Sequence, residues 1–235
     1  MVDNAAVSTE LDRICSEAKK LAFDKYAWRN KKDEPNFKIS KFESPHFNGK
    51  VYKIESVLDV SPDALFNFIY PPNCEWNPHV EKVDVLEELS DNSLLMHYYM
   101  KPSFEGILKG RDAIQAVRMV DGGDMKSICR AFQFHSERFK LRVQFSEGSV
   151  DVPQHPPEDG KVRAFNYPSA TFIEKVEGDG NKSKVTSIIQ ADIKASVPPQ
   201  ILSKAFYHLI EEHHKALVKC DCSSAPSFAG KPGRK

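Results

Sequence analysis

Between residues 80 and 194 the chain is a succession of short strand-like runs, and this succession constrains the fold more than any other feature. In the first run, Val83 and Val85 alternate with charged residues. Turn-forming clusters such as Asp121-Gly122-Gly123 separate the runs, and the proline-rich residues 151–160 predict a long surface loop. The predicted strands cover residues 83–89, 94–100, 113–120, 126–135, 139–145, 162–176 and 184–194.

Helical patterns flank these runs. Residues 9–32 predict an amphipathic helix with Thr9 as its N-cap, because Leu, Ile and Ala recur at three- and four-residue steps. Ser61 and Pro62 predict the N-cap and first residue of a short helix. The last predicted element is a long helix over residues 198–219.

A hairpin is predicted between the first two helices. Residues 36–42 and 51–58 are strand-like, and the turn dipeptide Asn48-Gly49 separates them. The order of helix, hairpin, short helix, many strands and long helix indicates an α+β fold with an antiparallel sheet. A curved sheet that closes on the last helix would bury that helix's apolar side. The periodicity leaves open whether the space between them is filled or hollow.

Composition narrows the class of protein. Lys plus Arg and Asp plus Glu both number 33 in 235 residues, a zero net charge that argues against a dedicated nucleic-acid binder. No stretch reaches the ~18 apolar residues of a membrane span, and no secretory signal is recognisable at the start. The five cysteines are therefore expected to be reduced thiols of a cytoplasmic protein, and we expect a monomer.

Patterns for catalysis and metal binding are weak. Cys220-Asp221-Cys222 supplies two thiolates, too few for a tetrahedral zinc site, and residues 208–214 lack the two-histidine spacing of a zinc helix. No nucleophile elbow, phosphate loop or dinucleotide fingerprint is present. We predict no catalytic residues, no metal and no cofactor.

The last predicted helix carries an apolar stripe that one histidine interrupts. The stripe contains Leu202, Phe206, Leu209, His213, Leu217 and Cys220. His213 is either a satisfied core histidine or a polar group that faces a ligand in an apolar cavity. In the run 113–120, alternation places Gln115 and Val117 on one face and Arg118 on the other, and either face could be the wet one.

Four segments, taken in order, resemble the StAR-related lipid transfer (START) domain family. They are residues 76–80 (WNPHV), residues 94–97 leading to Arg111-Asp112, residues 160–164 (GKVRA), and residues 192–194 followed by Val197-Pro198. The resemblance covers residues 8–220, and residues 221–235 are predicted to be a flexible tail. It implies a helix-grip fold: a curved antiparallel sheet around a long C-terminal helix, with a hydrophobic tunnel that binds one lipid.

The chain departs from the sterol-binding members of that family at two positions. They carry an acidic residue directly after the histidine matched by His97, and here that position is Tyr98. Their buried arginine falls six residues after Arg111, where this chain has Val117, with Arg118 one residue later. Either a bulge returns Arg118 to the cavity or the cavity lacks the charge pair. Ligands of low polarity, such as carotenoids, are therefore candidates beside sterols and phospholipids.

The leading hypothesis is non-enzymatic binding and transfer of one hydrophobic small molecule, with transient contact at membrane surfaces and no nucleic-acid partner. The helix and adjacent loops would gate the cavity. The predicted ligand-binding residues are Tyr98, Gln115, Val117, Arg118, Leu202, Phe206, Leu209, His213 and Leu217. One alternative is a helix-grip enzyme, a cyclase or hydrolase, that uses His213 and Tyr98 as its acid–base pair. The other is a lipid-regulated scaffold that engages a partner through the proline-rich loop or the tail.

Overall fold

The computed structural model describes residues 4–69, 74–90, 92–122, 125–131, 144–146, 149–151, 155–219 and 221–222. The helices are α1 (Asn4–Phe23), α2 (Pro62–Phe68) and α3 (Pro199–Lys219). The strands are β1 (Arg29–Glu34), β2 (Phe37–Glu43), β3 (Lys50–Leu58), β4 (Val80–Ser90), β5 (Ser93–Met100), β6 (Arg111–Asp121), β7 (Met125–Ala131), β8 (Gln144–Ser146), β9 (Ser149–Asp151), β10 (Val162–Arg163), β11 (Phe165–Asn166), β12 (Ser169–Val176), β13 (Asp179–Ile189) and β14 (Ala191–Asp192).

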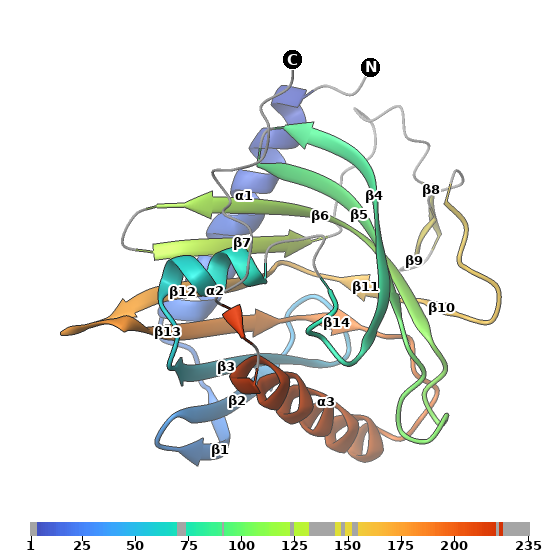
Figure 1. Cartoon of the computed structure of the whole chain (residues 1–235). Coiled ribbons are helices and arrows are strands. Elements are labelled where there is room, and N and C mark those ends of the chain that lie inside the picture. The colour runs from blue at the N-terminus through green and yellow to red at the C-terminus, as the bar shows by residue number, and fades with distance from the viewer. Residues whose placement is uncertain are drawn as a thin grey trace.

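One large antiparallel sheet dominates the fold, as the sequence predicts. Its strand order is β1-β2-β3-β13-β12-β7-β6-β5-β4, and β10 pairs in parallel with β6 off this path. The sheet curves, and β4, β5 and β6 bend most strongly (Figure 1). In that view α1 passes behind the strands, whereas α2 and α3 lie in front of and below them. The predicted α+β fold with a curved sheet and a long C-terminal helix is confirmed.

Helix α1 covers the outer face of the sheet. Its side chains Leu11, Ile14, Ala18, Leu21 and Ala22 are all buried, which confirms the predicted apolar stripe. Of these, Ala18, Leu21 and Ala22 pack in one cluster with Cys129 of β7 and Phe172 of β12. This layer is a conventional filled core.

The inner face of the sheet is covered by α2 and α3. Leu65 and Phe66 of α2 pack on strands β5, β6, β7, β12 and β13, and Ser61 caps the helix by accepting a hydrogen bond from the Ala64 N–H at 3.3 Å. Ile210 of α3 packs against β2 and β3. Ser61 is thus confirmed as the N-cap, and the predicted hairpin is confirmed as β2 and β3.

The N-terminal helix begins and ends earlier in the chain than predicted. It begins at Asn4, so Thr9 lies inside it rather than at its cap, and it ends at Phe23 rather than at residue 32. Residues 29–34 form the edge strand β1 instead. Trp28 explains the switch, because its ring packs edge-on against Phe42 of β2 with 4.6 Å between centroids and so aligns the following residues with the sheet edge.

Two other predicted strands differ in extent. The predicted strand 162–176 is divided into β10, β11 and β12, and Pro168, which has no N–H to donate to a ladder, lies in the gap between β11 and β12. Strand β7 ends at Ala131, so the rest of the predicted strand 126–135 and most of 139–145 lie outside the described residues. The predicted tail from 223 onward also lies outside them.

We predict that Phe172→Ala lowers the free energy of unfolding by about 3–5 kcal/mol, because it opens a cavity under α1. Phe172 is 2% exposed and packs edge-on against Phe23 of α1, with 5.1 Å between ring centroids. Urea unfolding measures the change. Lys175→Ala, at an exposed position of the same strand, is the control and should cost less than about 0.5 kcal/mol. Equal losses from the two variants would contradict this account of the outer core.

Candidate functional site: an internal cavity

A cavity of about 320 Å³ lies between the inner face of the sheet and α3. Its volume falls at the lower end of the ~300–1,000 Å³ range of small-molecule pockets. The wall includes apolar side chains from α3 and from strands β3, β4, β5 and β13, such as Ile54, Val185, Ile189 and Phe206. Among the described residues that line it, none is Asp, Glu, Lys or Arg. The cavity is therefore suited to an apolar, uncharged molecule.

The structure brings six of the nine predicted ligand-binding residues together at this cavity. They are Tyr98, Gln115, Phe206, Leu209, His213 and Leu217. Val117 lies beside it, fully buried in the cluster formed with α2. Leu202, on the first turns of α3, is half-buried and is not part of the cavity lining. The residues of α3 that are fully buried are Ala205 and Ile210, because much of the predicted stripe faces the cavity instead of packed side chains.

Arg118 points away from the cavity. The pairing of β5 with β6 runs without a register shift from Ser93–Arg118 to Met100–Arg111, so no bulge turns its side chain inward. Its Nε donates to Ser93 Oγ at 3.1 Å, and its guanidinium also pairs with Asp12 of α1. The placement of Arg118 in the cavity is therefore wrong, because simple alternation puts Gln115 and Val117 on the inner face.

Tyr98 and Val117 occupy the two positions where the resemblance would place a buried acid and arginine. The Tyr98 O–H lies 3.8 Å from the sulfur of Met96, its neighbour on the same face. Val117 offers no polar atom. The cavity thus lacks a charge pair at these positions, the second of the two possibilities that the sequence left open.

Two polar pairs stand in the cavity wall. Asn166 Nδ2 donates to Gln115 Oε1 at 2.9 Å, and Ser187 Oγ donates to Thr171 Oγ1 at 3.2 Å. Sequence analysis missed Asn166, Thr171 and Ser187 because polar residues in strands are ordinarily solvent-facing. The signal that could have found Asn166 is its place directly after the motif of residues 160–164.

His213 lies at the cavity wall with its ring edge-on to Trp76, at 4.9 Å between centroids. The next residue, His214, also lines the cavity and stacks flat on Phe37 of β2 at 3.9 Å. Burial lowers the pKa of His214. Both histidines are thus held against aromatic rings where α3 closes the hollow.

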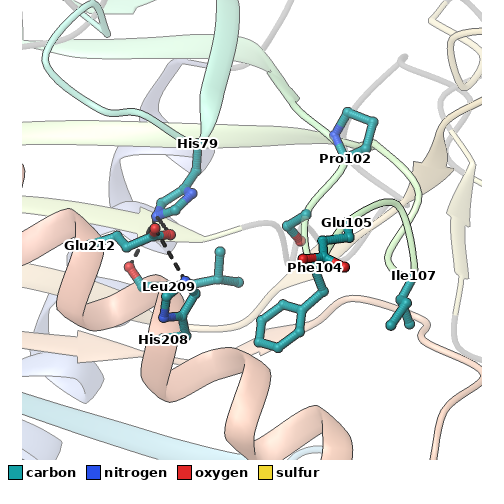
Figure 2. Close-up of a pocket in the computed structure, with 9 residues that line it drawn as sticks. His79, Pro102, Phe104, Glu105, Ile107, His208, Leu209 and Glu212 are labelled. Atoms are coloured by element: carbon teal, nitrogen blue, oxygen red, sulfur yellow. Dashed lines mark hydrogen bonds and ion pairs between the residues drawn. The ribbon is translucent and has the colours of Figure 1, made fainter.

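A second pocket, of about 520 Å³, lies outside α3, between this helix and residues 102–107 (Figure 2). His79 Nε2 donates to the carbonyl oxygen of Leu209 at 3.1 Å and thereby ties the start of β4 to α3. Phe104 packs edge-on against His208 at 5.7 Å and has a left-handed backbone, with φ of 55°. A non-glycine residue in this conformation stores strain of about 1–3 kcal/mol, which the surrounding contacts must hold.

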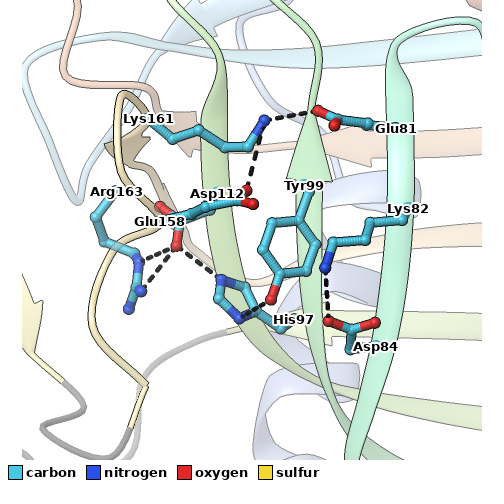
Figure 3. A network of polar contacts seen from close by, with 9 residues as sticks. All are labelled: Glu81, Lys82, Asp84, His97, Tyr99, Asp112, Glu158, Lys161 and Arg163. Atoms are coloured by element: carbon cyan, nitrogen blue, oxygen red, sulfur yellow. Dashed lines mark hydrogen bonds and ion pairs between the residues drawn. The ribbon is translucent and has the colours of Figure 1, made fainter.

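A buried polar network ties β5, β6 and β10 together on the outer face (Figure 3). His97 Nε2 donates to Asp112 Oδ2 at 2.7 Å, and the hydroxyl of Tyr99 is hydrogen-bonded to His97 Nδ1 at 2.8 Å. Arg163 donates to the same Asp112 oxygen at 2.8 and 3.1 Å. Burial opposes the charge on Asp112, but these hydrogen bonds outweigh it and lower the pKa of the carboxyl group.

Arg111 and Asp112 are both buried, and each has a different partner. Arg111 Nε donates to the carbonyl oxygen of Ile193 at 3.1 Å, on the segment that leads into α3. Asp112 receives Arg163. As neighbours on a strand, the two side chains serve opposite faces of the sheet.

Comparison with known proteins assigns the family. The START domain sequence pattern matches residues 9–129 and 142–217. The chain belongs to the START domain family. StAR-related lipid transfer protein 5 of Bos taurus is 21% identical over 211 residues, which is 87% of this chain and 91% of the relative. StAR-related lipid transfer protein 4 of Homo sapiens is 24% identical over 225 residues, which is 92% of this chain and 97% of the relative.

Solved structures support the START fold. Human StAR-related lipid transfer protein 5 superposes with a TM-score of 0.79 at 16% identity, covering 92% of this chain and 96% of that one. Within the described residues, no cluster of three or more His, Cys, Asp or Glu side chains could hold a metal ion. None of the helices in the part of the chain that the structure describes is long and apolar enough to cross a bilayer.

We predict that Asp112→Asn lowers the free energy of unfolding by about 3–5 kcal/mol, because Arg163 and His97 lose a buried carboxylate partner. The Asp112 side chain is 0% exposed and that of Arg163 is 12% exposed. Urea unfolding measures the loss. The control is Asp59→Asn, whose carboxylate pairs with Lys182 at 88% exposure and should cost less than about 1 kcal/mol. If Asp112→Asn costs no more than its control, the network does not stabilise the fold.

We also predict that the protein loses stability as the pH falls below about 6.5. Burial lowers the pKa of His79 and of His214 from the ordinary value of 6.5. The unfolded chain then binds protons before the folded one, so stability is complete above pH 6.5 and falls as the pH approaches the lower folded-state values. Urea unfolding at pH 7.5 and 5.5 measures the loss. His214→Phe keeps the stack on Phe37, and an undiminished loss in that variant would contradict the role of His214.

Proposed function

We propose that this chain binds one hydrophobic small molecule in the internal cavity and carries it between membranes, without chemical conversion. The observation that carries the proposal is the uncharged, largely apolar lining of a hollow between the sheet and α3. An apolar ligand gains ~0.8 kcal/mol for each CH₂ group buried there. Membership of the START family, whose relatives named above are lipid transfer proteins, supports the same conclusion.

Sterols, phospholipids and carotenoid-like pigments are the ligand classes under this proposal. The protein would act as a cytoplasmic monomer that touches membrane surfaces transiently. Release would require movement of α3, because this helix forms one wall of the internal cavity and one wall of the outer pocket. The hydrogen bond from His79 to Leu209 and the contact of Phe104 with His208 are the ties that such a movement would break.

The first test is to express the protein, record its ultraviolet–visible spectrum and determine its mass by native mass spectrometry. A stoichiometric hydrophobic adduct is expected, and an organic extract identifies it. A mass equal to that of the bare chain, unchanged after incubation with liposomes and carotenoids, would overturn the proposal.

We predict that Ser187→Phe removes the bound lipid and stops transfer between liposomes, because the ring fills the cavity from β13. The matched control is Asn181→Phe, which places the same ring at an exposed position of the same strand and should transfer at the wild-type rate. Melting temperatures establish that both variants are folded. Undiminished lipid binding by folded Ser187→Phe would show that the ligand occupies another site.

A further inference from the structure

The two polar pairs in the cavity wall differ in how fully their hydrogen-bonding groups are used. The hydroxyls of Ser187 and Thr171 lie on directly opposed residues of β13 and β12 and bond each other. The amides of Gln115 and Asn166 share a single hydrogen bond, of 2.9 Å. Each primary amide has both a carbonyl and an amino group, so one bond uses half of what the pair offers.

The groups that this hydrogen bond leaves over are one donor and one acceptor. With Asn166 Nδ2 bonded to Gln115 Oε1, the amino group of Gln115 and the carbonyl oxygen of Asn166 are left without a protein partner among the described residues. If nitrogen and oxygen are exchanged in both amides, the remainder is again one donor group and one acceptor. Gln115 is 4% exposed, so bulk water does not satisfy its amino group. The pair therefore offers a donor and an acceptor side by side in the cavity wall.

The pair is held in place by the fold rather than by a mobile loop. Gln115 lies in β6, opposite Met96 of β5. Asn166 lies in β11, three residues after Arg163, whose side chain is fixed on Asp112. The Ala164 N–H also donates to the carbonyl oxygen of Asp112 at 2.8 Å. The buried ion pair on the outer face thus sets the position of Asn166 on the inner face.

We propose that the Gln115–Asn166 amide pair is a recognition subsite for the hydroxyl group of an uncharged lipid alcohol. The inference rests on the proposed function and narrows its ligand class. A hydroxyl can accept from the Gln115 amino group and donate to the Asn166 carbonyl at once, which satisfies both. A ketone can only accept, and a hydrocarbon leaves both amide groups unpaired.

Charged lipids fit this wall poorly. A phosphate or sulfate group would enter a cavity lined by no Asp, Glu, Lys or Arg among the described residues. An ion buried without an opposite charge loses its hydration without compensation. The subsite therefore selects twice, for a hydroxyl over a hydrocarbon and for a neutral over an anionic head group.

The test measures binding constants for lipids that differ in one group. The sterol set is cholesterol, cholestanone, cholestane and cholesterol sulfate, and the pigment pair is zeaxanthin and β-carotene. For wild-type protein we expect the alcohol of at least one set to bind at least about tenfold more tightly than its hydrocarbon, the ratio that corresponds to the loss of about 1.4 kcal/mol of hydrogen bonding. The ketone should fall between them, and the sulfate should bind more weakly than the alcohol.

Variants separate the subsite from the rest of the cavity. Gln115→Leu and Asn166→Leu should each bring the ratio of alcohol to hydrocarbon binding close to one while hydrocarbon binding persists. Two variants are used so that the test still works if one of them fails to fold. Melting temperatures are recorded for both. Gln200→Leu makes the same change at an exposed position at the start of α3 and should keep the wild-type ratio.

The outcomes distinguish the subsite from the carrier function. If lipids bind but wild-type protein does not prefer the alcohol, or if folded variants keep the preference, the subsite is overturned and the carrier function stands. If sulfate binds as tightly as alcohol, the selection for neutral head groups is overturned. If wild-type protein binds no member of either set and carries no adduct in native mass spectrometry, the proposed function itself is overturned.

Discussion

The buried carboxylate of Asp112 is the constraint on which the cavity depends. It accepts hydrogen bonds from His97 and from Arg163, and so joins β5 and β6 to the chain that arrives from residue 155. Separating the two partners of such a buried ion pair costs several kcal/mol, because each would be left as an uncompensated buried charge. The fold therefore keeps Asp112 and Arg163 in contact. Residues 164–166 follow directly and reach the inner face of the sheet. A contact on the outer face thus sets part of the inner wall.

The two faces of the sheet differ in how their side chains are packed. On the outer face, α1 packs a continuous apolar stripe into a filled core. On the inner face, Ala205 and Ile210 of α3 are fully buried, whereas Phe206, Leu209 and His213 line the hollow. Apolar side chains that face empty space forgo dispersion contacts, and a bound apolar molecule restores them. The same helix therefore closes the fold and offers the surface for a ligand.

The cavity wall opposite α3 carries no charge pair at the two positions that the sequence resemblance singles out. Tyr98 and Val117 stand where the resemblance to sterol-binding members implies a buried acid and arginine, and Arg118 pairs with Asp12 of α1 on the other face. The hydrogen-bonding groups in the wall are instead the amides of Gln115 and Asn166 and the hydroxyls of Thr171 and Ser187. A neutral wall of this kind changes the selection among lipids without changing the architecture that holds them.

The sequence by itself determined the element order, the capped helix at Ser61, the buried stripe of α1 and the family, because each depends on local periodicity or on short motifs. It did not determine which face of β6 lines the cavity. Alternation separates the two faces of a strand, but only the curvature of the sheet around α3 decides which face points inward. It also missed β1, whose polar residues become a strand only through the packing of Trp28 on Phe42. The pairing of Gln115 with Asn166, 51 residues apart, was decided by the tertiary structure alone, because it requires the Asp112–Arg163 contact to bring two distant strands together.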